Sequence, residues 1–377
     1  MVSEKRLLKL RSFMNENNLG LSMIMHPENQ YYISGFKAIT YSRPILLIVK
    51  PDSTSLIVPG LEERHAEAEA TVDETFVYYE HPERTESGIS YMDHLGKIIS
   101  TYATGTRIGI ESNAMPIGLA NHLKDSGYEL IDIGRKITEM RFIKDEQETE
   151  LLIEAGKLVS LALSVSLKNA RVGISEIELD QFGNKALFEE TAKRYPDSSL
   201  DYLVMSPSGL SRSIMPHVFS NTRKLQQNDI VIHSRQVGLN GYRAECERTF
   251  FIGKPTDIQK EVFNVAVEAQ KTAMQTIRPG IRAKEVDMAA RKIIQKAGYG
   301  EYSIHRTGHG LGLGLHEEPY LRFDSDLLLQ QGMVFSIEPG IYIPNIGGFR
   351  HSDTVIITKN GAKVITDYPR ELKDLMF

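Results

Sequence analysis

The sequence of 377 residues contains a single cysteine, Cys246, and no tryptophan. One cysteine cannot form a disulfide within its own chain, which is typical of proteins that work in a reducing compartment. No apolar run approaches the ~20 residues that a helix needs to span a bilayer. The first residues carry mixed charge and do not lead into the apolar segment of a secretion signal. These absences predict a cytoplasmic protein with no membrane partner.

A strong excess of charge of one sign is also lacking. The 44 lysines and arginines nearly balance the 49 aspartates and glutamates, and the net charge is −5. Without a basic excess or a basic stripe, no nucleic-acid partner is expected. Hydrophobic residues make up 41% of the chain and charged residues 25%, a balance typical of folded domains. At ~150 residues per domain, the length predicts two domains.

Short apolar strands alternate with helical patterns in the first third of the chain. The segments 44–49 and 55–58, for example, are separated by the turn residues 51–53. This alternation predicts an α/β domain over residues 1–135. A capping box at Asp145 and Glu148 then predicts the start of a long helix in a second domain, residues 136–377. The fold class is therefore α/β (α+β), with strands and helices in both domains.

The segment 228–250 is predicted to be a β-hairpin with its turn near residues 238–241. On the returning strand Glu245 and Glu247 share one face, because side chains alternate along a strand. Two glutamates on one face repel each other when both are ionised. The pair indicates either a binding site or a face that is simply solvated.

Three further segments concentrate unusual residues. Residues 305–319 hold three histidines and four glycines. Glycines let a ligand approach the backbone, and histidines offer ligand nitrogens or acid/base groups near neutral pH. Glu338 ends an apolar strand just before a Pro-Gly turn, and residues 347–354 include Arg350 and lead into another strand. Residues 305–319 favour a site, whereas either of the last two segments could also be an ordinary turn.

Together these segments resemble the pita-bread family of methionine aminopeptidases, prolidases, Xaa-Pro aminopeptidases and creatinase. The resemblance covers nearly the whole chain and implies a creatinase/prolidase-type N-terminal domain (1–135), a pita-bread catalytic domain (136–377) and a homodimer. It rests on these segments: 27–36, 141–146, Gly241-Tyr242, Arg248-Thr249-Phe250, Gly308-His309-Gly310, His316-Glu317, Glu338-Pro339-Gly340 and Arg350.

The resemblance also implies where metals would bind. The peptidases of this family hold two divalent metals with Asp, Asp, His, Glu and Glu, and this chain has Ser234, Glu245, His309, Glu338 and Ser352 at those positions. A neutral serine is a poor ligand for a divalent cation. We therefore expect no dinuclear metal centre and no cofactor. A single metal on Glu245, His309 and Glu338 stays open as an alternative.

The departures resemble creatinase, which has this fold without a metal. Where the peptidases have threonine before Arg-Thr, creatinase has a glutamate, here Glu247, and His217 and Glu338 also match its pattern. The resemblance therefore implies a metal-independent hydrolase of a C–N bond in a small substrate of the amidino, guanidino or cyclic amidine type. His217 would be the general acid/base, and Glu247 and Glu338 would complete the catalytic set by binding the substrate cation. The expected substrate-binding residues are Glu245, His309, His316 and Arg350.

Two other functions remain open at this point. The chain could be a Xaa-Pro dipeptidase or aminopeptidase with an atypical or single metal. It could also be a binding protein that has kept a peptidase fold without catalysis.

Overall fold

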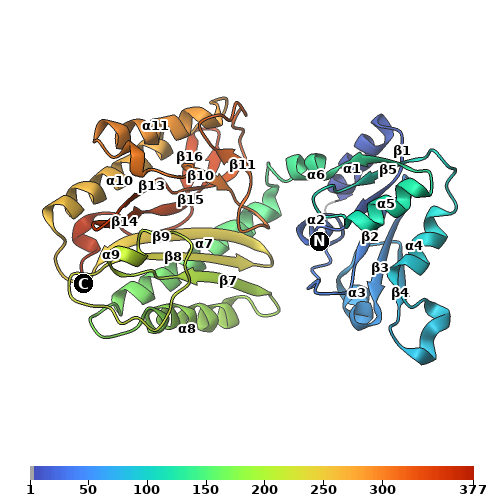
Figure 1. Cartoon of the computed structure of the whole chain (residues 1–377), viewed down its shortest axis with the longest axis horizontal. Helices are drawn as coiled ribbons and strands as arrows, with labels where there is room; N and C mark the ends of the chain where they lie inside the picture. The colour runs from blue at the N-terminus through green and yellow to red at the C-terminus, as the bar shows by residue number, and fades with distance from the viewer. Residues whose placement is uncertain (1–3) are drawn as a thin grey trace. The chain divides into compact units, whose positions relative to one another are not determined.

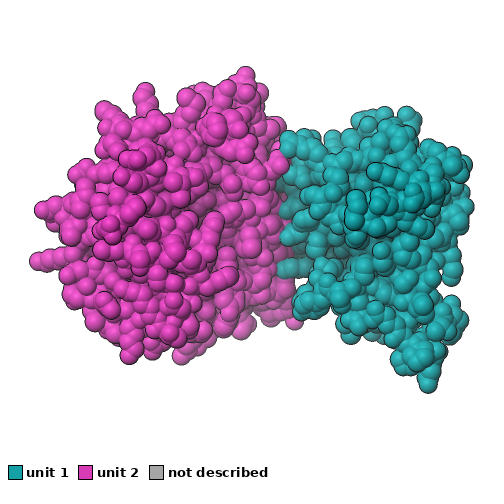
Figure 2. Space-filling model, in the orientation of Figure 1, with its two compact units in different colours: residues 1–141 teal, residues 142–377 magenta. Residues whose placement is uncertain are grey.

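The computed structural model describes residues 4–377. Contacts divide the chain into two compact units, residues 1–141 and 142–377, shown in two colours in Figure 2. Both units combine a β-sheet with helices (Figure 1), and the predicted fold class is confirmed. No helix in the described part of the chain is both long and apolar enough to cross a membrane.

The first unit is built on a six-stranded mixed sheet with the order β4-β3-β2-β1-β5-β6. Its central strand β1 pairs in parallel with β5 and antiparallel with β2. Apolar side chains of helices α4 and α5, such as Leu95 and Leu123, pack with those of the sheet in one buried cluster. The elements are α1 (Glu4–Glu16), β1 (Leu19–Ile24), α2 (Pro27–Ser34), β2 (Leu46–Val49), β3 (Thr54–Pro59), α3 (Glu63–Glu69), β4 (Glu74–Tyr78), α4 (Tyr91–Ile99), β5 (Arg107–Ile110), α5 (Ile117–Asp125), β6 (Glu129–Asp132) and α6 (Gly134–Met140).

The second unit is built on an eight-stranded sheet with the order β11-β10-β12-β15-β9-β8-β7, in which β16 adds to β15, while β13 and β14 form a separate hairpin. Its helices are α7 (Glu146–Lys168), α8 (Glu176–Arg194), α9 (Gly209–Arg212), α10 (Asp257–Thr276) and α11 (Ala283–Lys296). Its strands are β7 (Leu200–Met205), β8 (Ile230–Leu239), β9 (Tyr242–Phe251), β10 (Gly308–Gly310), β11 (Glu317–Leu321), β12 (Val334–Ile337), β13 (Gly340–Ile343), β14 (Gly347–Arg350), β15 (Ser352–Thr358) and β16 (Gly361–Val364).

Helix pairs cover this sheet. Helices α7 and α8 pack on each other and α7 packs on β8 and β9, whereas α10 and α11 pack together beside the later strands (Figure 1). Helix α7 begins with the expected capping box: Asp145 accepts a hydrogen bond from the backbone of Glu148 at 3.0 Å, and the Glu148 carboxylate accepts one from the backbone of Asp145 at 2.8 Å. The hairpin of β8 and β9 also forms as predicted, around a tight turn at Asn240 and Gly241, both of which have positive φ.

Candidate active site

Three adjacent strands place polar side chains side by side in the middle of the second sheet. Ser234 of β8 lies opposite Glu247 of β9, and Glu247 lies opposite Ser352 of β15. Glu245, two residues before Glu247, comes from the same strand, and both glutamates line one cavity. All four side chains are buried. Buried charges of one sign need compensation, so the neighbours of these carboxylates decide the chemistry of the site.

Glu247 is compensated by Arg350 at the end of β14. The Arg350 Nε atom donates to Glu247 Oε2 at 2.6 Å and its Nη2 atom donates to Oε1 at 2.8 Å. The hydroxyl of Ser234 also donates to Oε1. Burial raises the pKa of Glu247, although the Arg350 guanidinium opposes that rise, and Glu247 in turn holds the pKa of Arg350 well above its ordinary value despite burial. Both oxygens of Glu247 are therefore engaged within the protein.

Glu245 accepts two hydrogen bonds from neutral side chains. The Ser352 hydroxyl donates to Oε1 at 2.5 Å, and Gln236 Nε2 donates to Oε2 at 2.5 Å. No guanidinium or ammonium group among the described residues lies within ion-pair distance of this carboxylate, and its nearest cationic candidate is the ring of His309. The polar neighbours of the Glu245 carboxylate are therefore two neutral hydrogen-bond donors and the ring of His309.

His309 of β10 points its Nε2 atom between two carboxylates. That atom lies 3.3 Å from Glu338 Oε1 and 3.6 Å from Glu245 Oε2, and it makes no hydrogen bond of acceptable geometry. The other nitrogen, Nδ1, lies 3.0 Å from the carbonyl oxygen of Gly310, which fixes the proton of the neutral ring on Nδ1. Nε2 then presents a lone pair to two anions, an arrangement that is stable only with a cation at Nε2, either a proton or a metal ion.

The electrostatics around His309 agree with that geometry. Burial alone would lower the pKa of His309, but Glu245 and Glu338 raise it to about 10. Burial opposes ionisation of Glu338, and the His309 ring more than offsets this, so the pKa of Glu338 lies below its ordinary value. The ring of His316 stacks on His309 with the centroids 3.8 Å apart, and burial together with the charge on His309 lowers the pKa of His316 to about 4.

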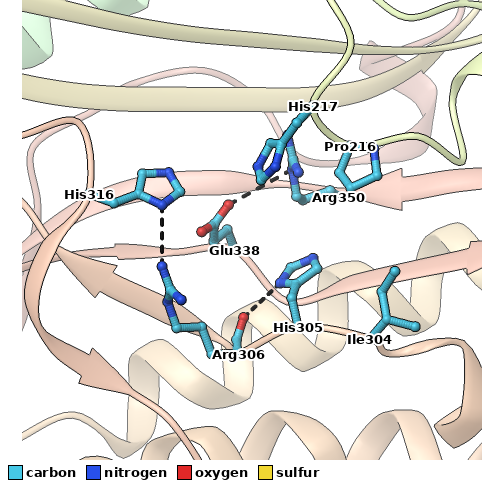
Figure 3. Close-up of a pocket in the computed structure, with 8 residues that line it drawn as sticks. All are labelled: Pro216, His217, Ile304, His305, Arg306, His316, Glu338 and Arg350. Atoms are coloured by element: carbon cyan, nitrogen blue, oxygen red, sulfur yellow. Dashed lines mark hydrogen bonds and ion pairs between the residues drawn. The ribbon is translucent and has the colours of Figure 1, made fainter.

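These side chains open onto a cleft with two lobes. One lobe, of about 260 Å³, is lined by Glu245, Glu247, Ser234, Gln236 and apolar side chains that include Leu203 and Met205. The other lobe, of about 340 Å³, is lined by Pro216, Ile304, His305 and Arg306 (Figure 3). Four residues line both lobes: His217, His316, Glu338 and Arg350. Glu245 and Glu247 line only the first lobe and Arg306 lines only the second, so a ligand that spans the lobes meets side chains of opposite charge at its two ends.

His217 stands at the junction of the lobes, on the loop after α9. Its ring lies 6.2 Å from that of His316, and Figure 3 shows it beside Arg350 and above Glu338. Partial burial lowers the pKa of His217, and the charge of Arg350 lowers it further. The imidazole is therefore neutral at neutral pH and free to accept a proton.

Arg306 lines the second lobe without an acidic partner. Its guanidinium lies 4.2 Å from the centre of the Tyr320 ring, and its Nη2 atom lies 3.2 Å from His316 Nδ1. Its Nε atom is buried and lacks a hydrogen-bond partner in the described part of the chain. A buried guanidinium nitrogen with no acceptor indicates that an anionic group of a ligand belongs there.

The structure brings together every residue expected at the site. Six of them line the cleft, and the seventh, His309, lies behind His316 against Glu245 and Glu338. Sequence reasoning missed Gln236, His305 and Arg306. The sequence did offer a clue to Arg306, because this arginine lies inside the histidine- and glycine-rich segment 305–319 that favours a site.

The ligand set fits one divalent metal and not two. His309 Nε2 faces Glu338 Oε1 at 3.3 Å and Glu245 Oε2 at 3.6 Å without a hydrogen-bond partner in the described part of the chain. Ligand atoms close enough together for one ion are found in two overlapping groups, Glu245 with His309 and His316, and Glu245 with Glu247 and Glu338. At the other metal position Ser234 and Ser352 supply neutral hydroxyls whose protons are already donated to Glu247 and Glu245. Divalent metals need several anionic oxygens, which that position lacks.

Comparison with known proteins identifies the family. A model of metallopeptidase family M24 matches residues 150–359, and a model of the creatinase/prolidase N-terminal domain matches residues 6–143. The Xaa-Pro dipeptidases of Pyrococcus horikoshii and Pyrococcus furiosus are each 33% identical to the chain, over 374 and 370 residues, and cover 98% of it and 99% of their own length. The crystal structure of recombinant prolidase from Thermococcus sibiricus superimposes with a TM-score of 0.86 at 32% identity and covers 99% of both chains.

These relatives overturn the expected function. The expectation of a metal-independent creatinase-like hydrolase of amidino or guanidino compounds is wrong, because full-length relatives at about one third identity bear the name Xaa-Pro dipeptidase. The physical reason lies in Glu247, whose carboxylate was expected to bind a cationic substrate and is instead paired with Arg350. The family itself was predicted correctly: the chain belongs to metallopeptidase family M24 and carries a creatinase/prolidase N-terminal domain.

Proposed function

We propose that the chain is a peptidase that hydrolyses dipeptides and other very short peptides with a free carboxyl end. The observation that carries the proposal is the cleft whose acidic lobe holds Glu245 and Glu338 and whose second lobe presents the unpaired Arg306. The lobe volumes of about 260 and 340 Å³ suit a small ligand. The names of the Pyrococcus relatives, Xaa-Pro dipeptidase, support the same reaction class.

Arg306 gives the cleft its preference for a free carboxylate. A guanidinium forms charge-assisted hydrogen bonds to a carboxylate, often two at once. Tyr320 holds the Arg306 guanidinium from one side and His316 from another, so little side-chain freedom is lost when the ligand binds. The scissile carbonyl of a substrate held at Arg306 then lies toward the acidic lobe.

His217 is placed to move the proton that peptide hydrolysis requires. A peptide C–N bond breaks when water adds to the carbonyl carbon and the leaving nitrogen gains a proton. A neutral imidazole at the junction of the two lobes can accept the first proton and deliver it to that nitrogen. A divalent cation held by Glu245, His309 and Glu338 would, when bound, polarise the carbonyl and acidify the water.

The test is a substrate panel with the full chain. Purified protein supplied with Mn²⁺ should release free amino acids from dipeptides, including those with proline in second position, and should cleave the matching dipeptide amides far more slowly. The variant His217→Ala should lose most of the activity, whereas His122→Ala, on the exposed surface of α5, should keep it. A folded, cation-supplied protein that cleaves none of the dipeptides would contradict the proposal.

A further inference from the structure

We propose that this chain binds one divalent cation, on Glu245, His309 and Glu338, and that the guanidinium of Arg350 replaces the second cation of the two-metal centre that the family resemblance implies. Cation binding does not require the chain to cleave a dipeptide. The two proposals can therefore fail separately, and a direct count of bound metal separates them.

The metal position that we propose this chain keeps is defined by the Nε2 atom of His309, which has no hydrogen-bond partner among the described residues. Its side chain is fully buried, and its Nε2 atom faces the Glu245 and Glu338 carboxylates at 3.6 and 3.3 Å without a hydrogen bond. Nitrogen and carboxylate ligands together suit borderline cations such as Zn²⁺, Mn²⁺ and Co²⁺. The contact from Nδ1 to the Gly310 carbonyl orients the ring, as hydrogen bonds to the free nitrogen do in other metal sites.

The second metal position of the implied two-metal centre is already occupied by side chains of the protein. Ser234 and Ser352 stand on the strands that flank Glu247, and both hydroxyls donate to glutamates of β9. Glu247, which accepts the hydrogen bond from Ser234, is also bound at two points by Arg350. A metal ion there would have to displace a buried ion pair and would find two uncharged hydroxyls in return.

The charge balance of the cluster also favours one metal ion per chain. The buried cluster contains three carboxylates, Glu245, Glu247 and Glu338, and one permanent cation, Arg350. One divalent ion beside that guanidinium brings the cluster to neutrality. A second divalent ion would leave two uncompensated positive charges in a site of low dielectric, where an unpaired buried charge is strongly unfavourable. The composition of the cluster therefore favours a single ion.

A metal count tests the proposal directly. The full chain is stripped with a chelator, loaded with excess Mn²⁺, freed of unbound ion by gel filtration and measured by elemental analysis. We expect one ion per chain. His309→Ala should reduce the count to near zero, whereas His217→Ala, the same substitution in the same cleft but outside the ligand set, should keep one ion. Two ions in the unaltered chain, or none, would overturn the proposal.

The role of Arg350 and Glu247 needs its own variant. The triple substitution Ser234→Asp, Ser352→Glu and Glu247→Thr places carboxylates at the two serine positions and frees the guanidinium, and the variant should bind two ions per chain. If the folded triple variant still binds one ion, Arg350 and Glu247 do not set the count. Electron paramagnetic resonance of the Mn²⁺-loaded natural chain gives an answer even if the variant does not fold: isolated Mn²⁺ is expected, and a spin-coupled pair would contradict a single-ion site.

Discussion

The Arg350 guanidinium binds the Glu247 carboxylate at two points, with Nε to Oε2 at 2.6 Å and Nη2 to Oε1 at 2.8 Å. Both side chains are only 3% exposed. The ion pair links β14 to β9; Arg350 lines both lobes of the cleft, and Glu247 lines the first lobe. Arg350 also lies 3.9 Å from Glu338, and His309 lies between Glu338 and Glu245.

Breaking this ion pair from one side should destabilise the fold strongly. Glu247→Gln or Arg350→Met should each lower the free energy of unfolding by about 3–5 kcal/mol, because the remaining charge is left buried without a partner. The double variant should cost clearly less than the two single variants added together. Urea unfolding checks this, with Lys157→Met on the surface pair with Glu154 as the control, which should cost less than about 1 kcal/mol. If the stability losses of the two single variants add up to the loss of the double variant, the two side chains do not interact, and the proposed pairing is contradicted.

Arg306 should act on substrate binding and depend on the free carboxylate. Arg306→Met should raise KM for dipeptides by roughly 10- to 100-fold, since a hydrogen bond to a charged group contributes about 1.5–3 kcal/mol. The same variant should leave the weak cleavage of dipeptide amides nearly unchanged, because these substrates have no carboxylate to lose. Steady-state kinetics on matched acids and amides measure both effects, and an equal loss on the two substrate sets would assign Arg306 a structural role.

His217 should set the acidic limb of the pH profile. Burial and Arg350 lower the pKa of His217 from 6.5, so the base form persists below pH 6.5 and kcat/KM should fall only at more acidic pH. His217→Ala should lower kcat by ~100- to 10,000-fold and remove that limb while the far-ultraviolet circular dichroism stays unchanged. A profile whose acidic limb is the same in the variant would exclude His217 as the proton carrier.

His351 should make the stability of the fold sensitive to acid. Its ring is fully buried, packs edge-on against Phe263 at 4.7 Å, and has no hydrogen-bond partner at either nitrogen in the described part of the chain. Burial, with the charges of Arg248 and Arg370, holds the pKa of His351 well below 6.5. Below pH 6.5 only the unfolded chain takes up this proton, so stability falls by about 1.4 kcal/mol per pH unit for this residue.

The variant His351→Leu should flatten that dependence. It removes the proton uptake of the unfolded chain without removing a hydrogen bond, so stability at neutral pH should stay equal or rise. Thermal or urea unfolding between pH 7 and pH 5 measures the two slopes, with His122→Leu on the surface as the control. Parallel slopes for the natural chain and His351→Leu would contradict the assignment.

Sequence patterns predicted the elements that local chemistry determines. The capping box of Asp145 and Glu148 and the β8–β9 hairpin depend on residues close together in the chain, and both form as expected. Strand β8 runs over Ile230–Leu239, within the segment that was expected to form the hairpin. Its polar residues are buried because Arg235 contacts Asn184 of α8 on one face, while Ser234 contacts Glu247 on the other.

The pairing inside the site could not be predicted in the same way. Which group neutralises Glu247 depends on the register between β9 and β15 and on the position of β14, more than a hundred residues along the chain. Arg243 and Arg350 are both arginines that could have met Glu247. The structure pairs Arg243 with Asp201 and Arg350 with Glu247, and this pairing removes the carboxylate on which the expected binding of a cationic substrate depended.

The most direct test of the whole account is a titration of dipeptide hydrolysis with metal. Chain stripped by a chelator should be inactive, and activity should return in proportion to added Mn²⁺ and level off at one equivalent per chain. Activity that survives the chelator, or that requires two equivalents, would contradict a peptidase that works with one cation beside Arg350.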